Sequence, residues 1–480
     1  MGMSTKPPSG MRDFLPNELV RRRYVISTIQ NIYEKYGFVP VETPSIENLS
    51  TLMGKYGDEG DQLLFRILHR RDKLARALEA ETITEKDLGD LGLRYDLTVP
   101  LARVVANNTD LPKFFKRYQI QPVWRADRPG KGRFREFLQC DVDITGTKSL
   151  VAEAEVCSAV SEVLLTLGFT NFSIHVNHRQ LLKALIKAAG ISLDNEATTL
   201  VAVDKLDKIG MEGVEKELVE RGINAEQIAK LVALIKRPEG TDEASELGRL
   251  KAALTGSEEA DKAIGELENL CKLLDESPAA GRYSIDATLA RGLGYYTGPI
   301  FEIRSSDFGG SLGGGGRYDG LIGMFKGSEI PAVGFSIGFE RLVLILEEKG
   351  LFGKLASGPD VMLCHFADVD DAAVIKAAKA MRSGGVKVEI FPETPKIGKQ
   401  ISYAETVGAR FVAILGANEA ASESVSLKNL ETGEHIEDDD FLLRYGNPVA
   451  IKADDGTILI LMAIEYYERM TGKTVDIKEE

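Results

Sequence analysis

One stretch constrains the fold of this chain more than any other: residues 116–144, which read KRYQIQPVWRADRPGKGRFREFLQCDVDI. Apolar and polar residues alternate from Tyr118 to Trp124, as in a β-strand with one buried face. The alternation stops at residues 129–132, PGKG, a sequence typical of a turn, and resumes from Arg133. The stretch therefore predicts a long antiparallel hairpin with a basic tip.

Charged, amide and aromatic side chains occupy every second position of this hairpin, so they share one face of the sheet. They are Arg125, Asp127, Arg135, Phe137, Gln139, Asp141 and Asp143. A face of this composition is costly to bury unless a polar ligand fills it. A charged edge hairpin that faces solvent is the alternative, but it leaves the lone tryptophan and the regular alternation unexplained.

The composition favours a soluble protein that needs neither disulfides nor structural zinc. A chain of 480 residues suits roughly two to four domains. Its four cysteines form no CxxC pair and no Cys/His cluster, which indicates a reducing compartment. No window is apolar enough to span a membrane, so we expect a cytoplasmic protein. The net charge of −14 argues against non-specific coating of nucleic acid, although a local basic groove remains compatible with it.

Changes in pattern divide the chain into five segments. The pattern of residues 1–178 predicts both helices and strands, with a charged, helix-prone surface insertion at residues 69–92. Residues 179–278 are rich in Lys, Glu, Leu and Ala at helical spacing, which predicts an inserted all-helical module. Strand patterns return over residues 279–350.

The C-terminal part has a different pattern. Residues 359–446 alternate strand and helix patterns, beginning with the strand VMLCHF, and this predicts a separate α/β domain with a parallel sheet. Residues 447–480 form a tail in which we expect one short helix around residues 462–470.

Other segments carry side chains suited to a polar ligand. Asp96 and Thr98 precede a predicted helix, where they either bind an ammonium group or cap the helix. Arg291 is followed by glycines, which let backbone and guanidinium approach a ligand closely. The glycine-rich residues 309–321 fit no strict phosphate-binding motif and are also typical of a flexible hairpin.

Taken together, these motifs resemble those of the histidyl-tRNA synthetases, which are class II aminoacyl-tRNA synthetases. FVPVETPSIE resembles the dimer-forming motif 1, VWRADRPGKGRFREFLQCDVDI motif 2 and VGFSIGFERL motif 3, in the family's order. LARGLGYYTG and GGGGRYDGL resemble the two histidine-specific signatures. The resemblance implies an α+β fold: an antiparallel-sheet class II catalytic domain with a helical insertion, followed by a C-terminal α/β anticodon-binding domain.

The activity implied by the resemblance is ATP-dependent ligation of histidine to tRNA. L-histidine would react with ATP, with Mg²⁺ present, to give histidyl-adenylate and pyrophosphate, and the histidyl group would then pass to tRNA(His). A homodimer is expected. The helical module would contact the acceptor stem, and the C-terminal domain would read the anticodon, with plausible RNA contacts at Lys396, Lys399 and Gln400.

The resemblance also implies roles for single residues. Asp96 and Thr98 would hold the α-amino group, with Leu97 between them in the histidine site. Arg125 would clamp the α-phosphate and the attacking carboxylate. Arg291 would take the far side of that phosphate, where related enzymes use a metal, and no side chain is assigned to a metal here. Gln139 would lie beside the amino acid. The imidazole would face Asp143, Tyr295 and Tyr296, and the ATP site would include Asp127, Phe137 on the adenine and Arg341 at the γ-phosphate.

The chain departs from the family pattern in four places. Gly294 stands where the family usually has Asp, which bears on the local support of Arg291, and Asp127 stands where motif 2 often has Glu. The insertion at residues 69–92 and the tail from residue 447 are additional.

Three other functions are compatible with parts of the sequence. One is a catalytically silent regulatory subunit of ATP phosphoribosyltransferase, a class that usually lacks the RGLxYYTG segment and the C-terminal domain found here. A non-enzymatic sensor of uncharged tRNA would not need the three arginines. The third is a nucleotide-binding α/β enzyme of unknown substrate, a function that rests on the glycine-rich loop alone.

Overall fold

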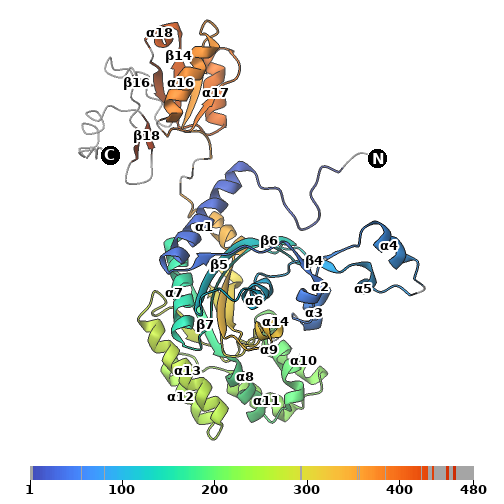
Figure 1. Ribbon diagram of the computed structural model, residues 1–480. Coiled ribbons are helices and arrows are strands. Elements are labelled where there is room, and N and C mark those ends of the chain that lie inside the picture. Colours follow the sequence, from blue (N-terminus) through green and yellow to red (C-terminus); the bar gives the residue numbers. More distant parts are fainter. Residues whose placement is uncertain are drawn as a thin grey trace. The chain divides into compact units, whose positions relative to one another are not determined.

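The computed structural model describes residues 4–430, apart from residues 56, 81, 292–294, 354, 356, 384 and 423, together with residues 435–436, 450–452 and 458–460. Two compact units make up the chain (Figure 1): residues 1–14 with 21–353, and residues 15–20 with 354–480. Gly294 and the helix expected around residues 462–470 lie outside the described residues.

A mixed sheet of eight strands forms the centre of the first unit (Figure 1). The strand order is β1-β5-β6-β11-β10-β9-β7-β8, with one parallel pair at each edge and antiparallel pairs between. The strands are β1 Val39–Pro40, β5 Phe115–Trp124, β6 Glu136–Thr145, β7 Ser173–His178, β8 Tyr283–Ile285, β9 Pro299–Ser305, β10 Phe308–Arg317 and β11 Ala332–Gly338.

The predicted hairpin is confirmed inside this sheet. Strands β5 and β6 pair antiparallel from Phe115 opposite Thr145 to Trp124 opposite Glu136. A bridge between Gly130 and Arg133 closes the tip. Because β6 also pairs with β11, the arm that carries the polar face is a central strand and not an edge.

Helices of the first unit pack on the sheet and on one another. Among them are α1 Pro16–Lys35, of which residues 21–35 belong to this unit, α6 Thr98–Asn107, α7 Val151–Thr166, α14 Gly323–Lys326 and α15 Phe339–Glu348. Helix α7 contacts β6 and β11, and α15 contacts β6, β10 and β11. The buried Arg317 of β10 lies 2.5 and 2.8 Å from the carboxylate oxygens of Glu153, which fixes α7 to the sheet.

A small sheet and a projecting arm precede α6 (Figure 1). Strands β2 Ile46–Asn48, β3 Arg66–Ile67 and β4 Leu91–Leu93 pair antiparallel in the order β2-β4-β3, with α2 Leu49–Leu52 and α3 Gly57–Gln62 between the first two strands in the chain. The insertion holds α4 Arg71–Leu78 and α5 Glu85–Leu88, and α4 buries none of its side chains. This matches the expected surface insertion.

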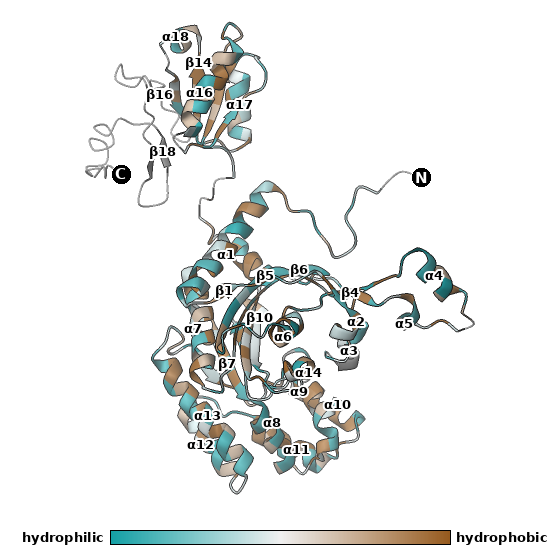
Figure 2. Ribbon diagram, in the orientation of Figure 1, coloured by the Kyte–Doolittle hydropathy of each residue, from teal (hydrophilic) through white to brown (hydrophobic). Residues whose placement is uncertain are grey.

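The segment between β7 and β8 is helical, as predicted. It comprises α8 Arg179–Ala188, a 3-10 turn Leu193–Asn195, α9 Glu196–Val203, α10 Leu206–Glu220, α11 Ala225–Ile235, α12 Glu243–Ala253 and α13 Glu258–Asp275. Asn224, Asp242 and Ser257 cap three of these helices by accepting backbone N–H groups. Figure 2 shows hydrophilic and hydrophobic residues side by side along these helices, as expected for elements with one buried face.

The second unit contains the predicted α/β alternation. Its sheet has the order β13-β12-β14-β15-β16, with the first three strands parallel. The strands are β12 Val361–His365, β13 Val388–Ile390, β14 Phe411–Leu415, β15 Ser426–Asn429 and β16 His435–Ile436, and the helices are α16 Asp371–Ser383, α17 Ile397–Thr406 and α18 Ala417–Ala421. A separate pair joins β17 Ala450–Lys452 and β18 Ile458–Ile460.

One expected RNA contact in this unit is wrong. The side chain of Gln400 is fully buried, and its amide bonds both the N–H and the C=O of His365. It therefore serves as an internal link between α17 and β12 and is not available to RNA. Lys396 and Lys399 are exposed. Across the described part of the chain, none of the helices has the length and apolar character needed to cross a bilayer.

Two glycines allow the cost of backbone strain to be separated from that of a steric clash. Gly146 follows β6 with φ +91°, and a Cβ there would lie 1.8 Å from the carbonyl oxygen of Lys113. Gly281 has φ +65° but open space around the corresponding position. We expect Gly281→Ala to lower the free energy of unfolding by about 1 kcal/mol and Gly146→Ala by roughly 3 kcal/mol or more. Equal losses in urea denaturation would contradict this account of the turn after β6.

Candidate active site

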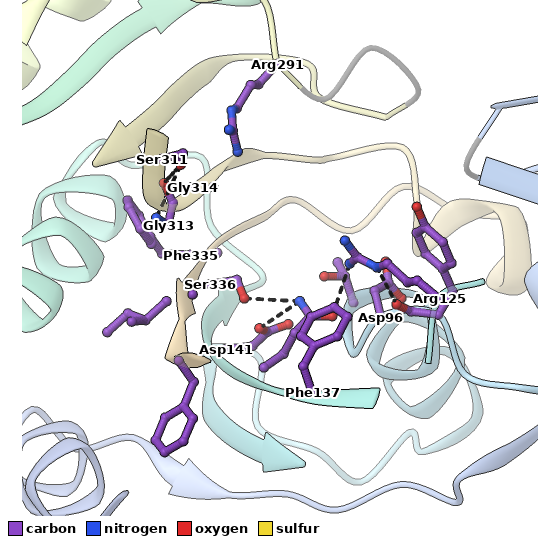
Figure 3. A pocket seen from close by; sticks show the side chains of 18 of the residues that line it. Asp96, Arg125, Phe137, Asp141, Arg291, Ser311, Gly313, Gly314, Phe335 and Ser336 are labelled. Atoms are coloured by element: carbon purple, nitrogen blue, oxygen red, sulfur yellow. Dashed lines mark hydrogen bonds between the residues drawn. The ribbon is translucent and has the colours of Figure 1, made fainter. Parts of the chain in front are cut away.

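A cavity of about 650 Å³ lies over the middle strands of the eight-stranded sheet (Figure 3). Small residues of β10 and β11 line it: Gly313, Gly314, Gly315, Gly334, Ser336 and Gly338. In the β6–β11 register, Gly334 lies opposite Asp143, Ser336 opposite Asp141 and Gly338 opposite Gln139. The small neighbours leave the polar side chains of β6 uncovered, and this creates the cavity.

Three arginines from distant parts of the chain line this cavity. Arg125 follows β5, Arg291 precedes β9, and Arg341 lies in the first turn of α15. Burial lowers the pKa of Arg341, and the charges of Arg291 and Arg133 lower it further. Like charges gathered in one cavity favour the binding of an anion.

Each of these arginines is held in place by a partner. Arg125 donates from Nε to the carbonyl of Tyr95 at 3.1 Å and from Nη2 to Gln139 Oε1 at 3.3 Å. Arg291 pairs through Nε with Glu302 of β9 at 2.9 Å. Arg341 donates to the carbonyl of Ser311. The guanidinium groups are therefore oriented before any ligand arrives.

Glu340 ties the hairpin to helix α15. Its buried carboxylate accepts bonds from Arg22 at 2.7 and 2.8 Å, from Arg12 at 2.5 Å and from the backbone N–H of Leu138 at 3.3 Å. Arg12 also stacks on Phe134, 3.3 Å from its ring centroid. The chain segment before α1 thus fixes the loop of the hairpin beside the helix that carries Arg341.

Carboxylates also line the cavity, and Asp96 lies beside Arg125 (Figure 3). Asp143 forms an ion pair with Arg117 at 2.7 Å and accepts a hydrogen bond from the Tyr318 hydroxyl at 2.5 Å. Burial raises the pKa of Asp143, and the Arg117 charge opposes that shift. Asp96 accepts the backbone N–H of Val99 at 3.1 Å, so it caps the start of α6 as well as lining the cavity.

Three tyrosines line the cavity as well. The rings of Tyr295 and Tyr296 meet edge to face, with centroids 4.7 Å apart, and Tyr295 meets Tyr318 in the same way at 6.2 Å. Burial raises the pKa of each well above the ordinary range, so their hydroxyls stay protonated at neutral pH.

The structure brings nearly all of the predicted site residues to this one cavity. Those that line it are Asp96, Thr98, Arg125, Asp127, Phe137, Gln139, Asp143, Arg291, Tyr295, Tyr296 and Arg341. Leu97 does not. Its side chain is fully buried in the core, and its carbonyl accepts a hydrogen bond from Arg117 at 3.3 Å. Leu97 therefore supports the site from behind.

Sequence reasoning missed several residues of the site. Tyr318 was visible in the GGGGRYDGL segment, and Asp141 in the alternation of the hairpin, but neither received a role. Arg117 and Glu302 give no local signal, because their importance depends on which strands lie side by side. Among the residues described, no group of three or more His, Cys, Asp or Glu side chains is arranged to hold a metal ion.

Known proteins resemble the chain along most of its length. A family model described as histidyl-tRNA synthetase matches residues 10–342, and one described as anticodon binding domain matches residues 360–441. The chain belongs to the histidyl-tRNA synthetase family. A histidine–tRNA ligase of Christiangramia forsetii is 42% identical over 446 residues, covering 90% of this chain and 97% of the relative. One from Bacteroides fragilis is 43% identical over 443 residues, with the same coverage.

Solved structures of synthetases agree with this assignment. Histidyl-tRNA synthetase from Nostoc sp. PCC 7120 superposes with a TM-score of 0.76 at 33% identity, covering 91% of this chain and 97% of that one. The predicted family and fold class are therefore confirmed. A Bacillus halodurans protein described as an ATP phosphoribosyltransferase regulatory subunit/histidyl-tRNA synthetase has a TM-score of 0.70 at 22% identity, which shows the shared fold alone.

Substitutions of two arginines distinguish a residue that stabilises the fold behind the site from one that lines the open cavity. Arg117→Met leaves the buried carboxylate of Asp143 without its cation, and we expect it to lower the free energy of unfolding by roughly 3 kcal/mol or more. Arg125→Met removes a half-buried arginine from the open cavity, and we expect a change of less than about 1 kcal/mol. Urea denaturation measures both. A larger loss for Arg125→Met would contradict the assignment of Arg117 as the supporting residue.

Proposed function

We propose that this chain joins L-histidine to tRNA(His) in two steps, with histidyl-adenylate formed in the cavity from histidine and MgATP. One observation carries the proposal: three fixed arginines line the same cavity as buried carboxylates and tyrosines. That arrangement suits a substrate with an ammonium and an imidazole at one end and a nucleotide triphosphate at the other. The identity to curated histidine–tRNA ligases extends over nine-tenths of the chain and supports the same activity.

The arginines would bind ATP. Arg125 and Arg291 would flank the α-phosphate, Arg341 would meet the γ-phosphate, and Phe137 would stack on adenine. Asp127 follows Arg125 in the loop, accepts the N–H of Arg128 at 2.8 Å and pairs with Arg133 at 3.4 Å, so it would keep the loop over the nucleotide. Mg²⁺ would arrive with ATP, held mainly by phosphate oxygens and water.

Positioning and electrostatics account for the first step. The histidine carboxylate attacks the α-phosphorus in line with the departing pyrophosphate, so two anions must meet. A phosphorus–oxygen bond forms to the carboxylate as the bond to the bridging oxygen of pyrophosphate breaks. Two guanidinium groups that are already fixed stabilise the charge that develops on the phosphoryl oxygens, without reorganisation during the reaction.

Glu302 would support Arg291 in this role. Its carboxylate holds Arg291 Nε at 2.9 Å and lies 3.7 Å from Arg304, which in turn pairs with Asp286 at 3.2 Å. This chain of charges runs across β9 and the segment after β8, and it leaves the two terminal nitrogens of Arg291 for the phosphate. The family usually has Asp at the position of Gly294, where it bears on the local support of Arg291. In this chain Glu302 would provide support for Arg291.

The carboxylates and tyrosines would bind histidine. Asp96, Thr98 and Gln139 would hold the α-amino group, whereas Asp143, Tyr295 and Tyr296 would face the imidazole. Asp143 is itself oriented by Arg117 and Tyr318. A side chain without an imidazole N–H would leave this buried carboxylate short of a donor, which costs roughly 1–3 kcal/mol and favours histidine over isosteres.

The remaining parts of the assignment concern assembly and RNA. Motif 1 favours a class II homodimer, and the family's role in translation favours the cytoplasm. The helical module would contact the acceptor stem of tRNA(His). In the second unit, the exposed Lys396 and Lys399 are candidates for contacts with the anticodon arm.

Removing Arg291 tests the function most simply. Arg291→Ala should slow histidine-dependent exchange of pyrophosphate into ATP by roughly 100-fold or more, because one of two cations at the α-phosphate is lost. Histidine affinity, measured by calorimetry, should change much less. Arg282→Ala is the matched control, since Arg282 is partly exposed, does not line the cavity and contacts only the carbonyl of Thr170 and the ring of Phe172 among its described contacts.

The same assay separates the alternatives. Wild-type protein that binds histidine but catalyses no exchange would favour a regulatory subunit. Binding of tRNA without adenylate formation would favour a sensor of uncharged tRNA.

A further inference from the structure

The side-chain amide of Gln139 has three polar neighbours in the cavity, Arg125, Asp141 and Ser336, which are labelled in Figure 3. Its nitrogen donates to Ser336 Oγ at 3.1 Å and to Asp141 Oδ1 at 3.3 Å. Its oxygen accepts a bond from Arg125 Nη2 at 3.3 Å. All three neighbours line the same cavity as Gln139.

These neighbours determine which way the amide points. A guanidinium only donates, so the atom beside Arg125 must be the amide oxygen. An ionised carboxylate only accepts, so the atom beside Asp141 must be the amide nitrogen. Arg125 and ionised Asp141 therefore favour the same orientation of the amide. A protonated Asp141 would not enforce it, because its O–H could donate to the amide oxygen instead.

Asp141 is an unusual residue for a buried central strand. Its side chain is 2% exposed, and the register places it opposite Ser336 and Gln119. Burial raises the pKa of Asp141 to about 7, an effect that Asp143 and Asp96 reinforce and that Arg117 and a hydrogen bond from Ser336 oppose. Tyr295, Tyr296 and, from α1, Tyr33 also interact electrostatically with Asp141, and Arg125 lies beyond Gln139.

We infer that Asp141, together with Ser336, is a positioning residue for histidine binding: ionised Asp141 holds the Gln139 amide nitrogen, so that the amide oxygen faces the cavity and accepts from the substrate ammonium. The inference rests on the proposed function and adds a residue to it. Asp143 does not serve this task, because Arg117 and Tyr318 already engage its two oxygens. Asp141 is the carboxylate next to Gln139 on the same strand face.

The decisive variant is Asp141→Asn, which keeps the shape but can donate to Gln139, so that Arg125 is left as the only charged group that favours this orientation. We expect KM for histidine in pyrophosphate exchange to rise about tenfold, the equivalent of one lost hydrogen bond to a charged group, with kcat and KM for ATP within about threefold. Ser336→Ala, which removes the second acceptor, should raise KM for histidine less. Glu136→Gln is the matched control, because Glu136 is an exposed acid at the start of the same strand.

The pH profile gives a readout that a purely structural role would not move. The ionised fraction of Asp141 increases between pH 6 and 8, so the ratio of KM values for histidine, variant over wild type, should increase with pH. Titration of the substrate imidazole affects both proteins and cancels in this ratio. The Glu136→Gln ratio should stay flat.

A double-mutant cycle tests whether Asp141 acts through Gln139. In a Gln139→Ala background, Asp141→Asn should add little to the rise in KM. Additive effects, a flat pH ratio or an unchanged KM in folded Asp141→Asn protein would overturn the inference. If Asp141→Asn does not fold, Ser336→Ala is combined with Gln139→Ala in the same cycle. Additive effects of these two substitutions on KM would then overturn the inference. Absence of exchange in the wild type would instead contradict the proposed function.

Discussion

The pairing of β6 between β5 and β11 is the constraint on which the site depends. Side chains of a strand alternate between faces, so this register places Phe137, Gln139, Asp141 and Asp143 on the cavity side. The same register puts glycine or serine opposite Gln139, Asp141 and Asp143. A shift of one residue would send these polar side chains into the core on the other face and fill the cavity with Leu138, Cys140 and Val142. The chemistry of the site is therefore set by strand register first.

Placing charges on a central strand requires compensation, and the structure provides it from distant segments. Arg117 of β5 forms an ion pair with Asp143, and Glu302 of β9 forms one with Arg291. Glu340 of α15 forms ion pairs with Arg12 and Arg22. None of these pairs joins neighbours in the chain. Each fixes a group that would otherwise be buried without a partner, and the fixed groups leave Arg125, Arg291 and Gln139 oriented toward the cavity.

Sequence reasoning captured what depends on local pattern. The hairpin, the helical segment and the α/β alternation of the second unit follow from period and turn residues, and the motifs indicated the family. It failed where the answer depends on how elements pack in the folded chain. Leu97 was expected in the histidine site because its neighbours are, yet the turn into α6 points it to the core. Gln400 was expected to contact RNA with Lys396 and Lys399, but it lies on the buried side of α17. Glu302 reads as an ordinary strand residue until β9 is placed beside Arg291.

The central claim is that Arg125 and Arg291, which are far apart in the chain, act on one phosphoryl group. A crystal structure of the protein with a non-hydrolysable analogue of histidyl-adenylate tests it most directly. The account predicts that both guanidinium groups lie within hydrogen-bonding distance of the oxygens around the α-phosphorus, with the ammonium beside Gln139. A phosphate contacted by only one of the two arginines, or bound outside the cavity, would contradict it.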